Sequence, residues 1–252
     1  MSGTDSVERT VTNVDRNWRP LYIGGAVAAL FALVGTLADI IITMIPGWEI
    51  STVPASTEQW FDQLQANYLL GLRNLDLLNA IVSVIGIPMY VALYGAHRKV
   101  SQGYAALALV VVVLGTAVFV ANNAALPMLD LSRQYATATT ETQRLALQGA
   151  AQAMLAKGAH GGMGAFAGFL LPIIGTLLMA YAMLKGLVFR RLAALTGIVG
   201  TMFLLAYITG STFGLAPTGV LMAIALPGGL LMIAWNVMVA KKLFALAGKA
   251  RD

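Results

Sequence analysis

The sequence predicts an all-α fold, a polytopic membrane bundle of six transmembrane helices. Hydrophobic residues make up 58% of the 252-residue chain and charged residues only 11%, whereas soluble domains usually carry about 25% charged residues. Six long apolar runs cover most of the chain, at 20–46, 70–96, 103–127, 159–184, 191–212 and 217–240. Each run is long enough to cross a hydrocarbon core about 30 Å thick, which takes about 20 helical residues.

The segments around these runs divide the chain into three parts. Residues 1–19 form a polar N-terminal tail, residues 20–245 the transmembrane domain and residues 246–252 a C-terminal tail. The first run is too long for the core of a cleavable signal peptide, so we expect it to be a retained span. The 26 glycines predict helix contacts that depend on close approach of the backbones.

Two connecting loops are long, at about 47–69 and 128–158. We expect the second to be partly helical, because Thr140 and Gln143 have the spacing of a capping box and apolar residues then recur with a roughly helical period. A helix packed over the ends of the spans is the favoured interpretation. A helix that lies on the membrane surface is the alternative.

Each even-numbered run contains a proline: Pro88, Pro172 and Pro227. A proline inside a helix should kink it. A static kink is favoured over a moving gate, because proline is common in membrane helices.

Positively charged residues sort between alternate loops, and this asymmetry predicts the orientation. Of the 16 lysine and arginine residues, Arg73, Arg133, Arg144 and Lys157 fall on one side and the other 12 on the opposite side. Because cytoplasmic loops carry an excess of positive charge, we expect both termini in the cytoplasm and both long loops on the outer side.

Six polar residues in or beside the apolar runs are the candidate ligand-binding residues: Asp39, Arg73, Asp76, Asn79, Asn123 and His160. With a rise of about 1.5 Å per helical residue, all six fall in the outer third of the membrane. We expect Arg73, Asp76 and Asn79 on or beside one face of a continuous second helix. That face should point into the bundle, because a charge that faces lipid costs at least about 2.5–3.5 kcal/mol.

The charges in this group allow two interpretations. Arg73 can pair with Asp76 on its own helix or with Asp39 on the first span. Two carboxylates and one guanidinium leave one carboxylate without an obvious partner, and that group could exchange protons or hold a cation. The alternative is a structural clamp between the first two spans, and the two interpretations are about equally supported, because water reaches charges near the interface.

No catalytic or cofactor-binding signature stands out. The chain has no cysteine, no G-x-S-x-G or H-E-x-x-H motif and no phosphate-binding glycine loop after a strand. His97 belongs to the short loop His97-Arg98-Lys99, and the position of His160 relative to the aspartates does not suggest a metal site. We therefore expect no catalytic residue, no metal and no cofactor.

Three segments resemble a bacterial family of six-span membrane proteins known as domain of unknown function 4386. The family's second span is similar to LDLLNAIVSVIGIPMYVALYGAHRK (75–99), and its last span is similar to LPGGLLMIAWNVMVAKKL (226–243). Its basic turn between spans 4 and 5 is similar to LKGLVFRRLAALTGIVG (184–200), although Phe189 stands where a proline often precedes the arginine. The resemblance implies a six-span fold in a bacterial membrane, and it carries no established activity.

The favoured hypothesis is a multi-pass protein of the bacterial plasma membrane that binds, senses or transports a small molecule or ion in a polar pocket near the outer face. Its expected partners are the lipid bilayer and this ligand, without nucleic acid. One alternative is an intramembrane enzyme that acts on a lipid-like substrate with Asp39 or Asp76 as general acid or base, and another is a structural or partner-binding subunit. A cavity among the first four spans that contains both aspartates would favour the first two hypotheses.

Overall fold

A computed structural model describes residues 3–48, 53–159 and 162–250, with side chains described from residue 17 onwards. These residues form helices and no strand, which confirms the all-α prediction. In this described part of the chain, six helices are long and apolar enough to cross a membrane. They contain α1 (Gly3–Ile42), α4 (Leu77–His97), α5 (Gln102–Asn122), α8 (Met163–Gly186), α9 (Arg191–Thr212) and α10 (Thr218–Lys249).

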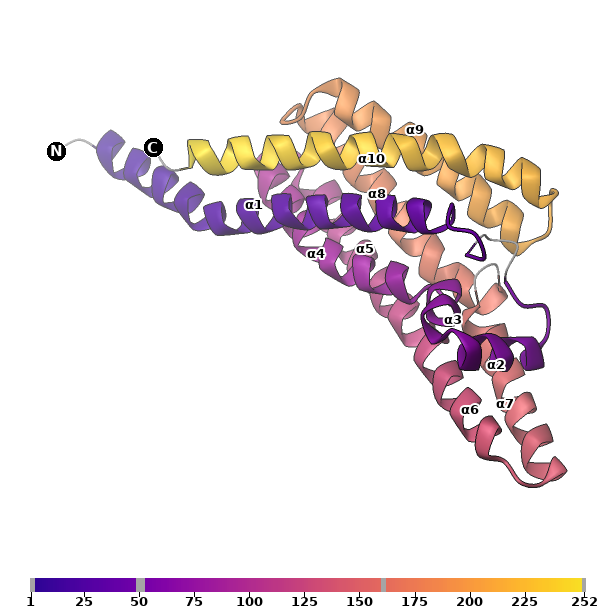
Figure 1. Ribbon diagram of the computed structural model, residues 1–252. Helices are drawn as coiled ribbons and strands as arrows, with labels where there is room; N and C mark the ends of the chain where they lie inside the picture. The colour runs from indigo at the N-terminus through magenta and orange to yellow at the C-terminus, as the bar shows by residue number, and fades with distance from the viewer. Residues whose placement is uncertain (1–2, 49–52, 160–161, 251–252) are drawn as a thin grey trace.

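The six spanning helices pack into a closed ring. Helix α1 contacts α4, and the order continues through α5, α8, α9 and α10, which returns to α1. The start of α1 and the end of α10 lie at the same end of the ring (Figure 1), which we call the terminal end. The other end, where the shorter helices gather, is called the cap end.

Glycines bring neighbouring spans of the ring close together. A Cβ atom on Gly25 of α1 would collide with the Cβ atom of Ala92 on α4, and a Cβ atom on Gly175 of α8 would lie 3.0 Å from the carbonyl oxygen of Ala108 on α5. Lipid tails are as apolar as the helix surfaces, so the hydrophobic effect does not drive helices together in a membrane. Helix association in lipid depends instead on close packing at small residues. The prediction of close backbone approach is confirmed at these contacts.

A dense apolar core fills the terminal end of the ring. It includes Leu93, Met179, Met183 and Leu243, all of them fully buried. His97 was expected in a loop, but it is the last residue of α4 and is fully buried in this core. Its ring stacks on Phe189 with centroids 5.5 Å apart, and its Nδ1 lies 2.8 Å from the Leu93 carbonyl oxygen. The terminal end of the ring is therefore closed by packed side chains.

Within the described residues, the cap end carries four shorter helices: α2 (Thr57–Ala66), α3 (Tyr68–Asn74), α6 (Ala125–Thr137) and α7 (Glu141–Gly158). Helices α6 and α7 form a hairpin that projects beyond α5 and α8, with α2 and α3 beside it (Figure 1). The capping box of Thr140 and Gln143 is present. One face of helix α7 packs at the span ends, since Ala151 shares an apolar core with Leu75, Ala124 and Met128. Phe61 of α2 belongs to the same core.

The second apolar run does not form one continuous helix. Helix α3 ends at Asn74 and α4 begins at Leu77, and Asp76 between them has the left-handed values φ 61° and ψ 23°. Asp is one of the few non-glycine residues that adopt this conformation readily. The expectation that Arg73 and Asp76 share a face of one helix is therefore wrong. In contrast, α4, α8 and α10 continue through their internal prolines.

Candidate ligand-binding site

A cavity of about 770 Å³ lies at the cap end of the ring, within the range of about 300–1,000 Å³ that is usual for small-molecule sites. Helices α1, α9 and α10 and the junction between α3 and α4 surround it. Its polar lining consists of Asp39, Arg73, Asn74, Asp76, Asn79, Tyr207, Ser211 and Thr218. Four of the predicted site residues, Asp39, Arg73, Asp76 and Asn79, thus line one cavity.

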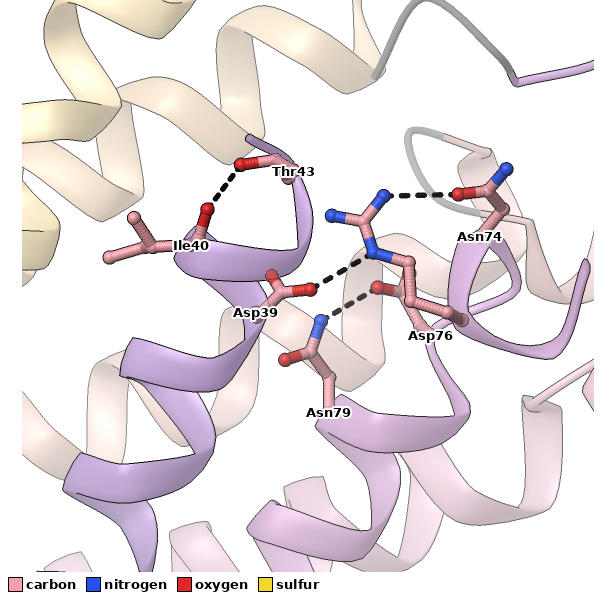
Figure 2. Close-up of polar contacts among 7 residues, drawn as sticks. Asp39, Ile40, Thr43, Asn74, Asp76 and Asn79 are labelled. Carbon is pink, nitrogen blue, oxygen red and sulfur yellow. Dashed lines mark hydrogen bonds and ion pairs between the residues drawn. The ribbon is translucent and has the colours of Figure 1, made fainter. Parts of the chain in front are cut away.

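An ion pair joins α1 to α3 at the wall of this cavity. The Arg73 Nε atom donates to the Asp39 carboxylate at 3.1 Å, and its Nη1 atom donates to Asn74 Oδ1 at 3.0 Å (Figure 2). Asn74 in turn donates to Gln63 on α2 at 3.1 Å. The Arg73 side chain is 12% exposed and the Asp39 side chain 34%, so the guanidinium is fixed by protein while one carboxylate partner remains open to the cavity. Of the two pairings that the sequence left open for Arg73, the structure has an ion pair with Asp39.

Asp76 points into the same space from the start of α4. Its left-handed backbone turns the chain between α3 and α4, and its carboxylate accepts a hydrogen bond of 2.8 Å from Asn79 Nδ2 (Figure 2). The residue is 6% exposed. As the N-cap residue of α4, it lies at the positive end of the helix dipole, which stabilises a negative charge by about 0.3–1 kcal/mol.

Asn123 has a different role from the one expected. It does not line the cavity: its Nδ2 atom donates to the Leu75 carbonyl oxygen at 2.9 Å, and its Oδ1 atom accepts from the Ala125 amide at 3.1 Å. Asn123 therefore links the junction between α3 and α4 to the start of α6, through the residue that precedes Asp76. His160 lies outside the described residues.

The opposite wall comes from helices that the sequence did not single out. Tyr207 and Ser211 lie four residues apart on α9, and Thr218 opens α10. The cavity contains both aspartates, but it lies between spans 1, 2, 5 and 6 rather than among the first four, because the closed ring brings α10 against α1. The only sequence signal was the spacing of Tyr207 and Ser211, which places both on one helical face.

The lining favours a positively charged occupant. Its two carboxylates and one guanidinium give a net formal charge of minus one, and its remaining polar groups are amides and hydroxyls that offer oxygen atoms. Within residues 3–48, 53–159 and 162–250, no group of three or more His, Cys, Asp or Glu residues gathers to hold a metal ion. The arrangement suits an organic cation or a loosely held monovalent ion better than a transition metal.

Comparisons with known proteins identify the family and no closer relative. A search of curated proteins found no match to the chain, and a search of solved structures found none either. A family model described as Domain of unknown function (DUF4386) matches residues 20–238, a range that begins within α1, ends within α10 and includes the whole cavity lining. With most of its length matched, and with six apolar helices as the resemblance implied, the chain belongs to the DUF4386 family.

Proposed function

We propose that this protein resides in the bacterial plasma membrane and binds a small, positively charged molecule or ion in the cap-end cavity, as a sensor or transporter of that ligand. The observation that carries the proposal is the cavity of about 770 Å³ with Asp39, Arg73 and Asp76 in its wall. Ionisable groups within membrane spans are costly and usually serve a function. Here they converge on an open space large enough for a ligand.

The cavity supports a ligand-binding role over a purely structural one. A clamp between α1 and α3 needs only the pair of Asp39 and Arg73, packed without intervening space. Asp76 is not needed for that clamp, yet a left-handed turn aims its carboxylate at the cavity. A binding role explains the placement of both carboxylates.

The charge distribution supports an orientation with the termini in the cytoplasm. Arg98 and Lys99 follow α4, and Lys185 and Arg190 flank the turn between α8 and α9 at the terminal end. Positive residues concentrate on the cytoplasmic side of membrane proteins. In this orientation the cap-end cavity faces the outer side, where it would meet solutes before they cross the membrane.

The test is a binding experiment with a matched pair of probes on the detergent-purified protein. Choline and its uncharged carbon analogue dimethylbutanol have nearly the same shape, and only choline carries a positive charge. We expect choline to raise the unfolding temperature and to give a saturable calorimetric signal, and dimethylbutanol to do neither. Methylammonium, guanidinium and sodium extend the probe set to smaller cations.

The matched variants are Asp76→Asn and Asp62→Asn. Asp76 lines the cavity, and Asn preserves its shape and its ability to adopt the left-handed backbone, whereas Asp62 is exposed on α2. Methylammonium and guanidinium can donate an N–H hydrogen bond to Asp76, and loss of such a charged hydrogen bond weakens binding by about 1.5–3 kcal/mol, which is more than tenfold. Choline has no N–H group and should lose the attraction between opposite charges instead. We expect these losses for Asp76→Asn alone. Absence of binding by all four cations to the wild type, or equal effects of both variants, would exclude the proposal.

A further inference from the structure

A second and smaller cavity lies deeper in the ring. Its volume is about 160 Å³, and α1, α4, α5, α8 and α10 surround it. We call it the mid-bundle cavity. Its polar lining is sparse and consists of Ser83, Tyr90, Thr116, Trp235 and Asn236.

Two residues of this wall have a polar atom that the described part of the protein does not satisfy, Oδ1 of Asn236 and Nε1 of Trp235. The Oδ1 atom of Asn236 is buried and finds no hydrogen-bond partner among the described residues, and the residue is only 6% exposed. Tyr90, in contrast, is paired with Thr176 on α8, with 2.6 Å between their oxygen atoms. A buried polar atom without a partner costs about 1–3 kcal/mol, and native proteins rarely keep one without a use.

The wall of the mid-bundle cavity also excludes charge. None of its lining residues in the described part of the chain is an aspartate, glutamate, lysine, arginine or histidine. An ion at this depth would therefore lack a counter-charge, at a cost of at least about 2.5–3.5 kcal/mol. A cavity of about 150 Å³ is large enough for a molecule the size of benzene, so a small organic solute fits.

From these observations we infer that the mid-bundle cavity is a second binding site, for a small uncharged solute that donates a hydrogen bond to Asn236. A primary amide or a small alcohol has this chemistry: an apolar body against the walls and an N–H or O–H group for the amide oxygen. This site differs from the cap-end cavity in charge, size and lining, and the inference does not depend on cation binding there.

The position of the mid-bundle cavity suggests how a solute reaches it. Asn79 lines the cap-end cavity and Ser83, one turn further along α4, lines the mid-bundle cavity. The Ser83 hydroxyl donates to the Asn79 carbonyl oxygen at 2.7 Å, which places both residues on one face of α4. The two cavities thus follow each other along α4 from the cap end towards the closed terminal end.

Trp235 provides a built-in reporter, because its ring forms part of the cavity wall and is fully buried. Replacement of the other three tryptophans by phenylalanine leaves Trp235 as the sole source of tryptophan fluorescence. Acrylamide is a small uncharged primary amide that quenches this fluorescence on contact. We expect saturable quenching, reversed by propionamide and not by propionate, its charged counterpart of nearly equal shape.

Three variants in this single-tryptophan background sharpen the test. Asn236→Leu removes the acceptor and should weaken acrylamide binding about tenfold, the effect of one hydrogen bond of about 1.4 kcal/mol. Gly86→Leu should abolish saturable quenching, because Gly86 lines the cavity and a Cβ atom there meets nothing within 4 Å, so the new side chain fills the space. Gly24→Leu is the matched control: Gly24 is exposed on α1 and its Cβ position is equally open.

The outcomes separate the second site from random diffusion and from the cap-end cavity. Quenching that rises linearly with acrylamide, or that is equal in all three variants, would overturn the inference, and so would an absence of quenching. Should Gly86→Leu fail to fold, Asn236→Leu and the competition by propionamide decide alone. Choline binding at the cap-end cavity should be unchanged by Gly86→Leu, so failure of one site is distinguishable from failure of the other.

Discussion

The ion pair between Asp39 and Arg73 should stabilise the fold by an amount between that of a surface pair and that of a fully buried pair. Exposed pairs contribute about 0.2–1 kcal/mol, and removal of one partner from a buried pair costs about 3–5 kcal/mol. The Arg73 side chain is 12% exposed and the Asp39 side chain 34%, so water screens one partner and not the other. We therefore expect Asp39→Asn to cost about 1–2 kcal/mol.

A double-mutant cycle measures this interaction directly. Asp39→Asn, Arg73→Met and the double variant would be unfolded thermally in detergent, with Asp62→Asn as an exposed control on α2. A chain of this size loses about 2–4 °C of unfolding temperature per kcal/mol. The single variant Asp39→Asn should thus unfold some degrees earlier, and the double variant should be more stable than the sum of both losses predicts. A coupling energy below about 0.3 kcal/mol, within the scatter of independent sites, would refute the buried-pair interpretation.

Three further outcomes are expected. Asp76→Gly should leave the left-handed turn intact. Asp76→Ala should lower the free energy of unfolding by about 1 kcal/mol more than Asp76→Gly does, because alanine is strained at positive φ. An equal loss of stability in both variants would show that the turn does not constrain the residue. Gly25→Val should reduce thermal stability by about 1–3 kcal/mol through collision with α4, and Gly24→Val, which faces open space, should not. The chain has no native cysteine, so a single introduced cysteine can be labelled with a thiol reagent that does not cross the membrane. On intact cells this reagent should label Thr139→Cys at the cap end and should not label Lys99→Cys at the terminal end. The reverse pattern would invert the proposed orientation.

The spans could be predicted because each one is specified by its own composition. A run of about 20 apolar residues has one favourable environment, whatever its neighbours do. The break at Asp76 could not be predicted, since no proline or glycine interrupts the chain between Arg73 and Asn79. A contact distant in sequence accompanies it: the Asn123 side chain takes the Leu75 carbonyl oxygen, which an unbroken helix would have used internally.

Some residues of the candidate site could also be predicted from the sequence, and others could not. Asp39 and Arg73 were identifiable from sequence because opposite charges in apolar surroundings must find each other. The contribution of Tyr207 and Thr218 depends on which helices are neighbours in the ring, and hydrophobic periodicity does not encode that order. The charged wall of the cavity could therefore be predicted from the sequence. The wall that α9 and α10 contribute depends on the tertiary arrangement alone.

The contact that closes the ring has a consequence for biogenesis. Helix α1 is made first and one of its final neighbours, α10, is made last of the described helices, with four other spans inserted between them. Until α10 arrives, α1 lacks one of its two neighbours in the ring, and Gly25 lacks Leu243 of α10, which lies beside it in the finished ring. The cap-end cavity is open on its α10 side during the same interval. Docking of α10 thus completes the ring and the walls of both cavities in one step. A chain interrupted at the start of α10 would insert its earlier spans and would have neither site.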